Sequence, residues 1–262
     1  MLKIGVNNSA IKITRLISMG LAMLVCALLP AVAATPEASA RRFDASPGRI
    51  STHFRVQTVG TPPSQRLERE VIQILETWHH LFLVAFEHEP DGPIQVMLHS
   101  LNNFHRDTGA PHWADGVYTA QGTIHAAIGG VARVEADLER RLAHELAHAF
   151  ITDLSAGEAP RWLQEGLAQA YSDLRPATAG NRPEITATTP ADLGYSGTLA
   201  FARALLARHG QAALRDTLAT MGSQHDVEAA FQAHTGASVA ELFAHWRAAQ
   251  SRVARRQNGE SR

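Results

Sequence analysis

The stretch RRLAHELAHAF, residues 140–150, carries two histidines four positions apart, with a glutamate directly after the first. Residues at this spacing project from the same face of an α-helix. His144 and His148 can therefore direct their imidazoles at one metal ion, with zinc–nitrogen distances of about 2.0–2.1 Å. Glu145 is rotated away from the histidine face, where it can reach a metal-held water molecule without being a ligand. The pattern predicts a helix that binds zinc and carries a general base.

The composition leaves a second interpretation of this helix open. The chain contains 14 histidines, so the pair can also arise by chance on a solvated helix face. The rest of the composition is globular, with 262 residues of which 45% are hydrophobic and 19% charged. A formal net charge of −1 gives no electrostatic reason for a nucleic-acid partner, and none is expected.

The first 34 residues have the pattern of a signal peptide. Lys3, Lys12 and Arg15 precede an apolar run over residues 16–29, and small residues follow at 31–34. The run is shorter than the roughly 20 residues of a membrane span, which disfavours an uncleaved anchor. We expect cleavage after residue 33 or 34, export to the periplasm or the medium, and no stable membrane span in the mature protein.

Export removes the single cysteine of the chain. Cys26 lies inside the apolar run, so a metal site in the mature protein must be built from histidines and carboxylates. Residues 35–48, rich in Ala, Pro and Ser, are expected to form a flexible lead-in. The domain is expected over 49–250, and 251–262 is expected to be a solvated basic tail.

Hydrophobic periodicity predicts strands before the motif and helices after it. Strands are expected over 49–60 and 94–99 and in a hairpin over 116–130, which turns near Gln121-Gly122 and whose segment Thr123–Ala127 is a candidate sheet edge. Helices are expected over 64–82, within 100–109, over about 134–153 and 161–174, and then over 196–209, 211–221, 224–235 and 238–252, with a loop at about 175–190. This order predicts an α+β fold, with a small mixed sheet followed by a mainly helical lobe.

A catalytic zinc has three protein ligands and one open position, so a third ligand is needed. The metzincin pattern is excluded, because it requires Gly and His where Ile151 and Leu154 stand. Three downstream carboxylates remain as candidates: Asp153, Glu158 and Glu165.

The three carboxylates differ in how well their positions suit a metal ligand. Asp153 lies on the motif helix, about one and a half turns past His148, and is expected to point away. Glu158 lies in a loop, where a side chain is placed less firmly. Glu165 lies on the next predicted helix beside Gly166, a residue that would let this helix approach the motif helix closely.

The sequence HELAH (144–148) followed by PRWLQEGLAQAY (160–171) resembles the gluzincin metallopeptidases, in particular the peptidase-MA-like group. The resemblance continues into residues 195–210 and 230–247. In that group the glutamate of a W-x-x-E-G motif is the third zinc ligand. The resemblance therefore implies a zincin-like domain that binds one Zn²⁺ through His144, His148 and Glu165, with Glu145 as the base.

Two further residues are singled out by the comparison with this group. Gln169 stands where relatives often carry a second glutamate, which leaves the surroundings of the ligands open. Tyr195 opens a predicted helix, and metallopeptidases of this kind often place a tyrosine near the substrate carbonyl as an oxyanion donor. A tyrosine packed in the core with a bonded hydroxyl is the alternative for Tyr195.

The predicted function is an exported zinc metallopeptidase acting on a peptide or protein. A zinc-activated water attacks the peptide carbonyl, and Glu145 takes its proton and passes it to the leaving amine. One alternative is a zinc hydrolase of another amide, such as a cell-wall peptide. The other is a catalytically silent zinc-binding scaffold, which the intact Glu145 disfavours.

Overall fold

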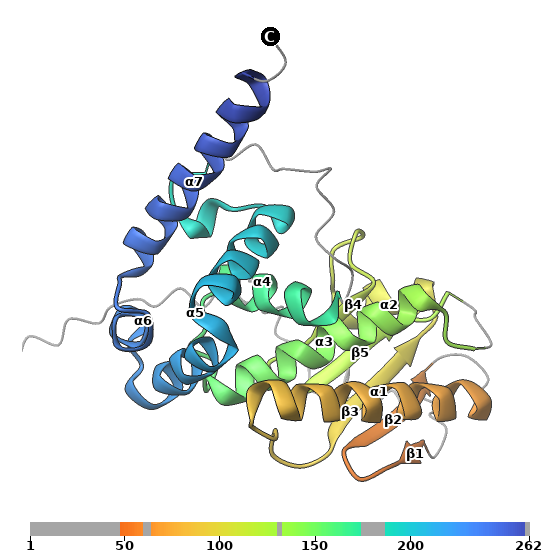
Figure 1. Ribbon diagram of the computed structural model, residues 1–262. Helices are drawn as coiled ribbons and strands as arrows, with labels where there is room; N and C mark the ends of the chain where they lie inside the picture. Colours follow the sequence, from red (N-terminus) through yellow and green to blue (C-terminus); the bar gives the residue numbers. More distant parts are fainter. Residues whose placement is uncertain (1–47, 60–63, 130–132, 174–186, 260–262) are drawn as a thin grey trace, which may run out of the picture. The chain divides into compact units, whose positions relative to one another are not determined.

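The computed structural model describes residues 48–59, 64–129, 133–173 and 187–259 (Figure 1). The expected signal peptide, residues 35–47 of the expected lead-in and most of the loop expected at 175–190 lie outside these ranges. No helix within them is long and apolar enough to cross a membrane.

Five strands of the described residues form one mixed sheet in the order β1-β2-β3-β5-β4. They are β1 (Arg49–Ile50), β2 (Phe54–Val59), β3 (Ile94–His99), β4 (Gly116–Tyr118) and β5 (Thr123–Ala127). β2, β3 and β5 are parallel neighbours, and the two edge strands run antiparallel to them. The predicted α+β class is confirmed, as are the strand at 94–99 and the hairpin that turns at Gly122.

Two predictions about the strands are wrong. The single strand expected over 49–60 is divided, because the chain reverses after Ile50 and the Ser51 backbone N–H donates to the Phe54 carbonyl. The segment Thr123–Ala127 is not the edge of the sheet. It pairs with β3 on one side and β4 on the other, so the short strand β4 is the edge.

One face of the sheet is covered by two helices, α1 (Gln65–Phe86) and α3 (Ala136–Leu154), which also pack on each other (Figure 1). The Ser64 hydroxyl caps α1 by accepting a hydrogen bond from the Leu67 backbone N–H. Val96 and Leu98 of β3 are fully buried in one core with both helices. This packing holds the motif helix, α3, rigidly against the sheet.

The other face of the sheet carries a smaller helix, α2 (Leu101–Thr108), which ends at Gly109 as predicted. Gly109 has a φ of 67°, a left-handed conformation that glycine adopts without steric cost. Phe104 of α2 packs on His99, their ring centroids 6.1 Å apart. Because successive side chains of a strand alternate, His99 lies on the face opposite to Leu98.

The C-terminal part is helical, as expected. It contains α4 (Arg161–Ser172), the short 3₁₀ helix η2 (Pro190–Asp192), α5 (Tyr195–Gln224), α6 (Val227–Thr235) and α7 (Val239–Gly259). Gly210, at φ 82° and ψ 166°, interrupts α5 at the break predicted between 209 and 211. α7 continues past residue 252 into the expected basic tail, where alanine and arginine both favour a helix.

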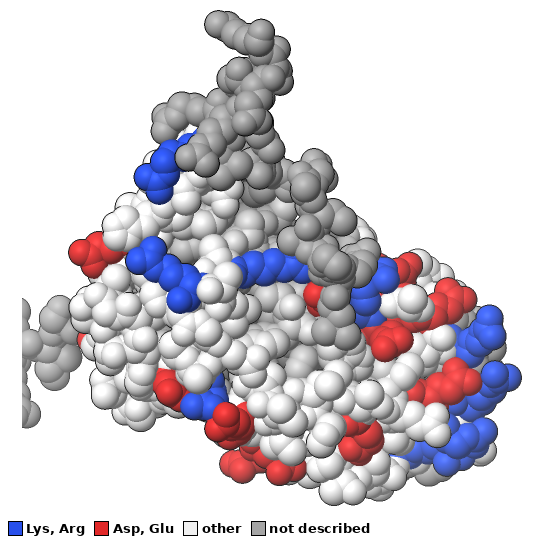
Figure 2. Space-filling model, in the orientation of Figure 1, with Lys and Arg blue, Asp and Glu red and all other residues white. Residues whose placement is uncertain are grey.

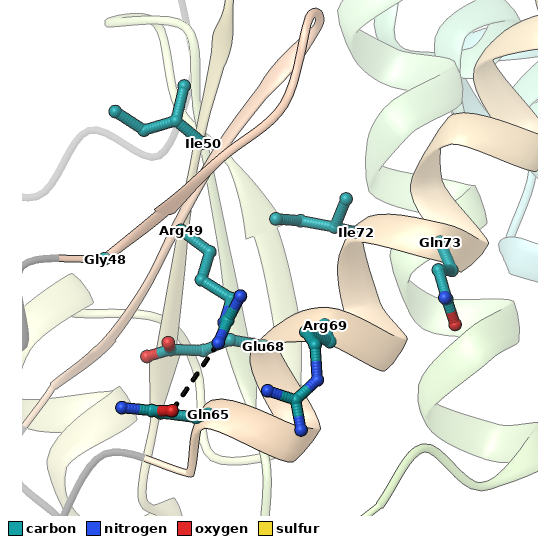
Figure 3. A pocket seen from close by; sticks show the side chains of 8 residues that line it. All are labelled: Gly48, Arg49, Ile50, Gln65, Glu68, Arg69, Ile72 and Gln73. Carbon is teal, nitrogen blue, oxygen red and sulfur yellow. Dashed lines mark hydrogen bonds between the residues drawn. The ribbon is translucent and has the colours of Figure 1, made fainter.

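A cavity lies between β1 and the first half of α1, far from the motif in sequence (Figure 3). The Arg49 guanidinium reaches across it to donate to Gln65, at 3.5 Å. The residues that line the cavity are Gly48, Arg49, Ile50, Gln65, Glu68, Arg69, Ile72 and Gln73. None of the predicted site residues is among them.

Charged side chains of both signs are present on the face of the molecule drawn in Figure 2. The basic side chains drawn there are arginines, and they lie among Asp and Glu side chains.

Candidate metal centre

The two histidines of the motif lie together on one face of α3. The Nε2 atoms of His144 and His148 are 3.2 Å apart, and the two rings are perpendicular. Leu142, Leu146 and Phe150, on the apolar side of α3, are fully buried and hold the helix in place. The burial of this apolar side leaves the histidine side facing the next helix.

Glu165 of α4 completes a group of three. Its Oε2 atom lies 3.7 Å from His144 Nε2, and one ligand atom from each of the three residues lies within 4.8 Å of the others. α4 is anchored by Trp162, Leu163 and Leu167, which belong to the core shared with α3. The W-x-x-E-G motif thus buries its apolar residues and turns Glu165 toward the histidines.

The spacing of these atoms fits a tetrahedral metal ion. Ligands about 2.0–2.1 Å from a tetrahedral zinc are separated from each other by about 3.3–3.4 Å. The observed 3.2 and 3.7 Å lie close to that value before a cation draws the ligands in. Two imidazoles and one carboxylate, with no thiolate, suit zinc and other divalent metals of the first transition row.

The protonation states of the ligands follow from burial and from their mutual contacts. Burial, and the charge of His144, lower the pKa of His148 to about 4, so its ring is neutral at pH 7. Burial opposes protonation of His144, but the contact with Glu165 and the charges of the neighbouring carboxylates outweigh it and raise the pKa of His144. Burial works against ionisation of Glu165, but the contact with His144 and the neighbouring cationic groups together outweigh it and lower the pKa of Glu165.

Glu145 lies beside the three-residue group and is almost fully buried, at 6% exposure. Burial is the main cause that raises the pKa of Glu145 to about 7, against the charge of His144. A carboxyl with this pKa exchanges protons readily near neutral pH. The backbone N–H of Tyr118, on the edge strand, lies near this carboxylate and favours its charged form.

Gly116 allows the edge strand β4 to approach the motif helix. A Cβ atom at this position would lie 2.8 Å from Glu145 Oε1 and 2.8 Å from Arg141 Cγ, closer than real Cβ contacts. Arg141 in turn donates to the Ala127 carbonyl at 2.6 Å, which ties α3 to the end of β5. The absence of a side chain at Gly116 therefore brings Glu145 against the sheet edge.

The expectation that Gly166 lets α4 approach the motif helix is wrong. A Cβ at Gly166 would lie 2.6 Å from the Thr198 carbonyl oxygen and 2.8 Å from Ala202 Cβ, and both of these residues belong to α5. The glycine therefore brings α4 close to α5. Gln169 reinforces the same contact, since its amide donates to Thr198 Oγ1 at 3.1 Å and to the Glu165 carbonyl at 3.0 Å.

Tyr195 lies at the rim of the candidate site, at the first position of α5. Its ring centroid is 6.3 Å from that of His144, and the residue is 65% exposed. Partial desolvation, and the charges of Glu165 and Glu145, raise the pKa of Tyr195, so the phenol keeps its proton at neutral pH. The exposure of Tyr195 argues against the alternative of a core tyrosine.

Three groups that orient the site were missed in the sequence. The Gln164 side chain lies near His148 and the Ala168 backbone carbonyl lies near His144, and each favours the protonated form of its ring. The third is the Tyr118 N–H. Gln164 could have been suspected from the sequence, because it directly precedes Glu165. The other two groups belong to the backbone, so the residue types at their positions do not reveal them. Such outer contacts fix the rotation of metal-ligating rings.

The two rejected carboxylates have other partners. Asp153 Oδ2 is 2.6 Å from His88 Nε2, and Glu158 Oε1 is 2.8 Å from His225 Nδ1. Asp153 thus points away from the histidine pair, as predicted. Among the described residues, the histidines at 105 and 112 belong to no candidate metal group, whereas His79 lies close to His53 and Glu89 in a second cluster of potential ligands.

The comparisons with known proteins do not assign the chain to a family. No protein-family model matches the chain, and no curated protein matches it significantly. The evidence for a metal centre is therefore the arrangement of His144, His148 and Glu165 within an α+β fold.

Proposed function

We propose that this protein is an exported zinc metallopeptidase with a gluzincin-like catalytic site. The observation that carries the proposal is the position of Glu145. Its buried carboxyl lies between the group of His144, His148 and Glu165 on one side and the backbone of the edge strand on the other. A metal site with only a structural role has no use for a fourth, non-ligating carboxyl of this kind.

His144, His148 and Glu165 would hold the zinc, which when bound polarises a carbonyl and acidifies a water molecule. Glu145 would accept a proton on its carboxylate and deliver it to the leaving amine. Its pKa of about 7 suits both steps, because the group must be a base first and an acid afterwards. The protonated Tyr195 hydroxyl would donate a hydrogen bond to the oxygen that gains charge.

An extended peptide is the substrate that the edge strand favours. Asp115 and Thr119, the residues that flank β4, hydrogen-bond to Ala127 and Thr123. Because bonded and non-bonded pairs alternate in an antiparallel ladder, the backbone groups of Gly116 and Tyr118 point outward from the sheet. A peptide can pair with such an edge by strand addition. The outward backbone groups lie next to Glu145, which would bring a scissile bond near the base.

A peptide-library digest of the purified mature chain tests the proposal. Cleavage is expected with zinc bound, and its loss is expected after treatment with a chelator, with recovery on adding zinc. Cleavage of cell-wall peptides in place of linear ones would indicate the other amide hydrolase. No cleavage by a fully zinc-loaded protein would contradict the enzyme and favour the scaffold. The intact mass of protein from the exported fraction tests export, with an expected first residue of Ala34 or Thr35.

A further inference from the structure

Two histidines contact each other on the face of the sheet that α2 covers. His99 is the last residue of β3 and His125 lies in the middle of β5. The Nε2 atom of His99 is 2.9 Å from the Nδ1 atom of His125, so one of these nitrogens donates a proton to the other. The ring centroids are 5.1 Å apart, about one ring radius on each side beyond the nitrogen pair, so the rings meet edge to edge. Neither ring takes part in the proposed peptidase mechanism.

Asp107 of α2 is the acidic group that faces this pair. Its Oδ2 atom is 3.4 Å from His99 Nδ1, and both atoms are shielded from solvent without a hydrogen-bond partner among the described residues. Its other oxygen, Oδ1, accepts a hydrogen bond from Arg106 Nε at 3.0 Å. The negative charge of Asp107 is therefore already offset by Arg106. A proton added to the histidine pair would leave a surplus positive charge in a buried region.

The other described side chains around the two rings supply no compensating negative charge. His105 of α2 turns its Nδ1 toward a backbone carbonyl 3.3 Å away, outside the pair. The ladder positions beside the two rings are apolar, and so is the α2 residue packed on His99: Val59, Met97, Val117 and Phe104.

Burial makes both rings resist protonation. It is the main cause that lowers the pKa of His99, against the attraction of Asp107. Burial also lowers the pKa of His125 to about 4, with a further contribution from the charge of His99. An exposed histidine has a pKa of about 6.5. The neutral pair therefore stabilises the fold fully above about pH 6.5, and this contribution is lost as the pH falls toward 4.

α2 is the element that can separate from the pair. It has eight residues and a single buried side chain, that of Phe104. Elements with few buried apolar contacts open locally at a low free-energy cost. A change of charge beneath α2 is thus enough to shift its packing equilibrium.

We propose that the His99–His125 pair is an acid-sensitive switch that holds α2 on the sheet while both rings are neutral and releases it when they are protonated. Release lets water reach the rings, which removes the cost of the buried charge. Residues 109–115 connect α2 directly to the edge strand β4, whose start is fixed by the hydrogen bond from the Ala127 backbone N–H to the Asp115 carbonyl. Release of α2 therefore loosens the start of the edge strand. The switch does not depend on the proposed peptidase function.

Hydrogen exchange of the mature chain at pH 7 and pH 5 tests the switch. Exchange of the α2 amides is compared with that of the α1 amides, after correction for the intrinsic effect of pH on exchange. In the wild type we expect the protection of α2 to fall by about tenfold or more, as the lowered pKa of His125 implies, while α1 stays protected. His125→Asn keeps a hydrogen-bonding group near the Nδ1 position but does not gain a proton. Its loss of α2 protection should be at least about threefold smaller.

Asp107→Asn should have the opposite effect, because it removes the attraction that favours a proton on the pair, so α2 protection should fall further than in the wild type. The control is His112→Asn, an exposed histidine outside the pair, which should behave as the wild type does. Equal losses in the wild type and His125→Asn would overturn the proposal. A simultaneous loss of α1 protection in the wild type would overturn it as well, because it would indicate unfolding of the whole domain. If His125→Asn does not fold, Asp107→Asn decides, and a loss no larger than that of the wild type would contradict the switch.

Discussion

The Glu145 carboxylate lies near the backbone N–H of Tyr118, which favours its charged form and belongs to the edge strand of the sheet. The two residues are 27 positions apart, and Gly116 makes the contact sterically feasible. The candidate base therefore lies next to the strand edge on which an extended peptide would pair. The first three predictions follow from this arrangement of base, ligands and edge.

Glu145→Gln separates metal binding from chemistry. The substitution keeps the shape and hydrogen-bonding capacity of the side chain but removes the proton acceptor. Zinc content is expected to stay at the wild-type level, while peptidase activity falls by about 10²–10⁴-fold, the contribution of positioned acid–base catalysis. Metal analysis and a fluorogenic peptide assay measure the two effects. His148→Ala is the comparison, and it should lose zinc at this site together with activity. Full activity in Glu145→Gln would rule out its role as the base.

Glu165→Ala tests the third ligand. Removing one of three ligands should lower the zinc affinity of the site severely, whereas Glu158→Ala and Asp153→Ala should leave it unchanged, because those carboxylates pair with His225 and His88. Competition with a chromophoric chelator gives the affinities. The ligand set would have to be revised if Glu158→Ala lost zinc and Glu165→Ala kept it.

Gly116→Ala tests the approach of the edge strand. The added methyl group would lie 2.8 Å from Glu145 Oε1, so β4 or the carboxylate must shift by several tenths of an ångström. We expect at least a tenfold loss of kcat with zinc content retained, since misplacement of a catalytic group by about 1 Å can cost about 10²-fold. Gly194→Ala is the matched control, because a Cβ there meets no atom within 4 Å and the backbone φ is −72°. Equal activity of both variants would show that the approach of β4 is not needed.

The zinc affinity of the His144 site should fall as the pH is lowered. The raised pKa of His144 means that this ring gains a proton first, above the ordinary histidine value of 6.5. Below that pKa zinc must displace one proton, so affinity should fall about tenfold per pH unit. The decline should steepen below about pH 4, where His148 also gains a proton. Chelator competition between pH 8 and 3 measures the slope and its steepening, and a flat profile would exclude His144 as a ligand.

The local features of the site were predictable because they depend on short spacings in the chain. The i, i+4 spacing of His144 and His148 and the position of Glu145 follow from helix geometry alone. Hydrophobic periodicity also located α1, β3 and the hairpin of β4 and β5, since each buries one side. Glu165 was implied by the family resemblance, and the structure brings it to the histidines.

The tertiary structure decided which elements are neighbours, because strand order and helix contacts depend on packing between distant residues. It placed β4 instead of β5 at the edge, and it turned Gly166 toward α5 instead of α3. It also brought His99, Asp107 and His125 together from three different elements, which no spacing in the sequence indicates. The sequence by itself determined two ligands and a base on one helix. Only the packing of the sheet, α1 and α4 around that helix supplied the third carboxylate and the strand edge.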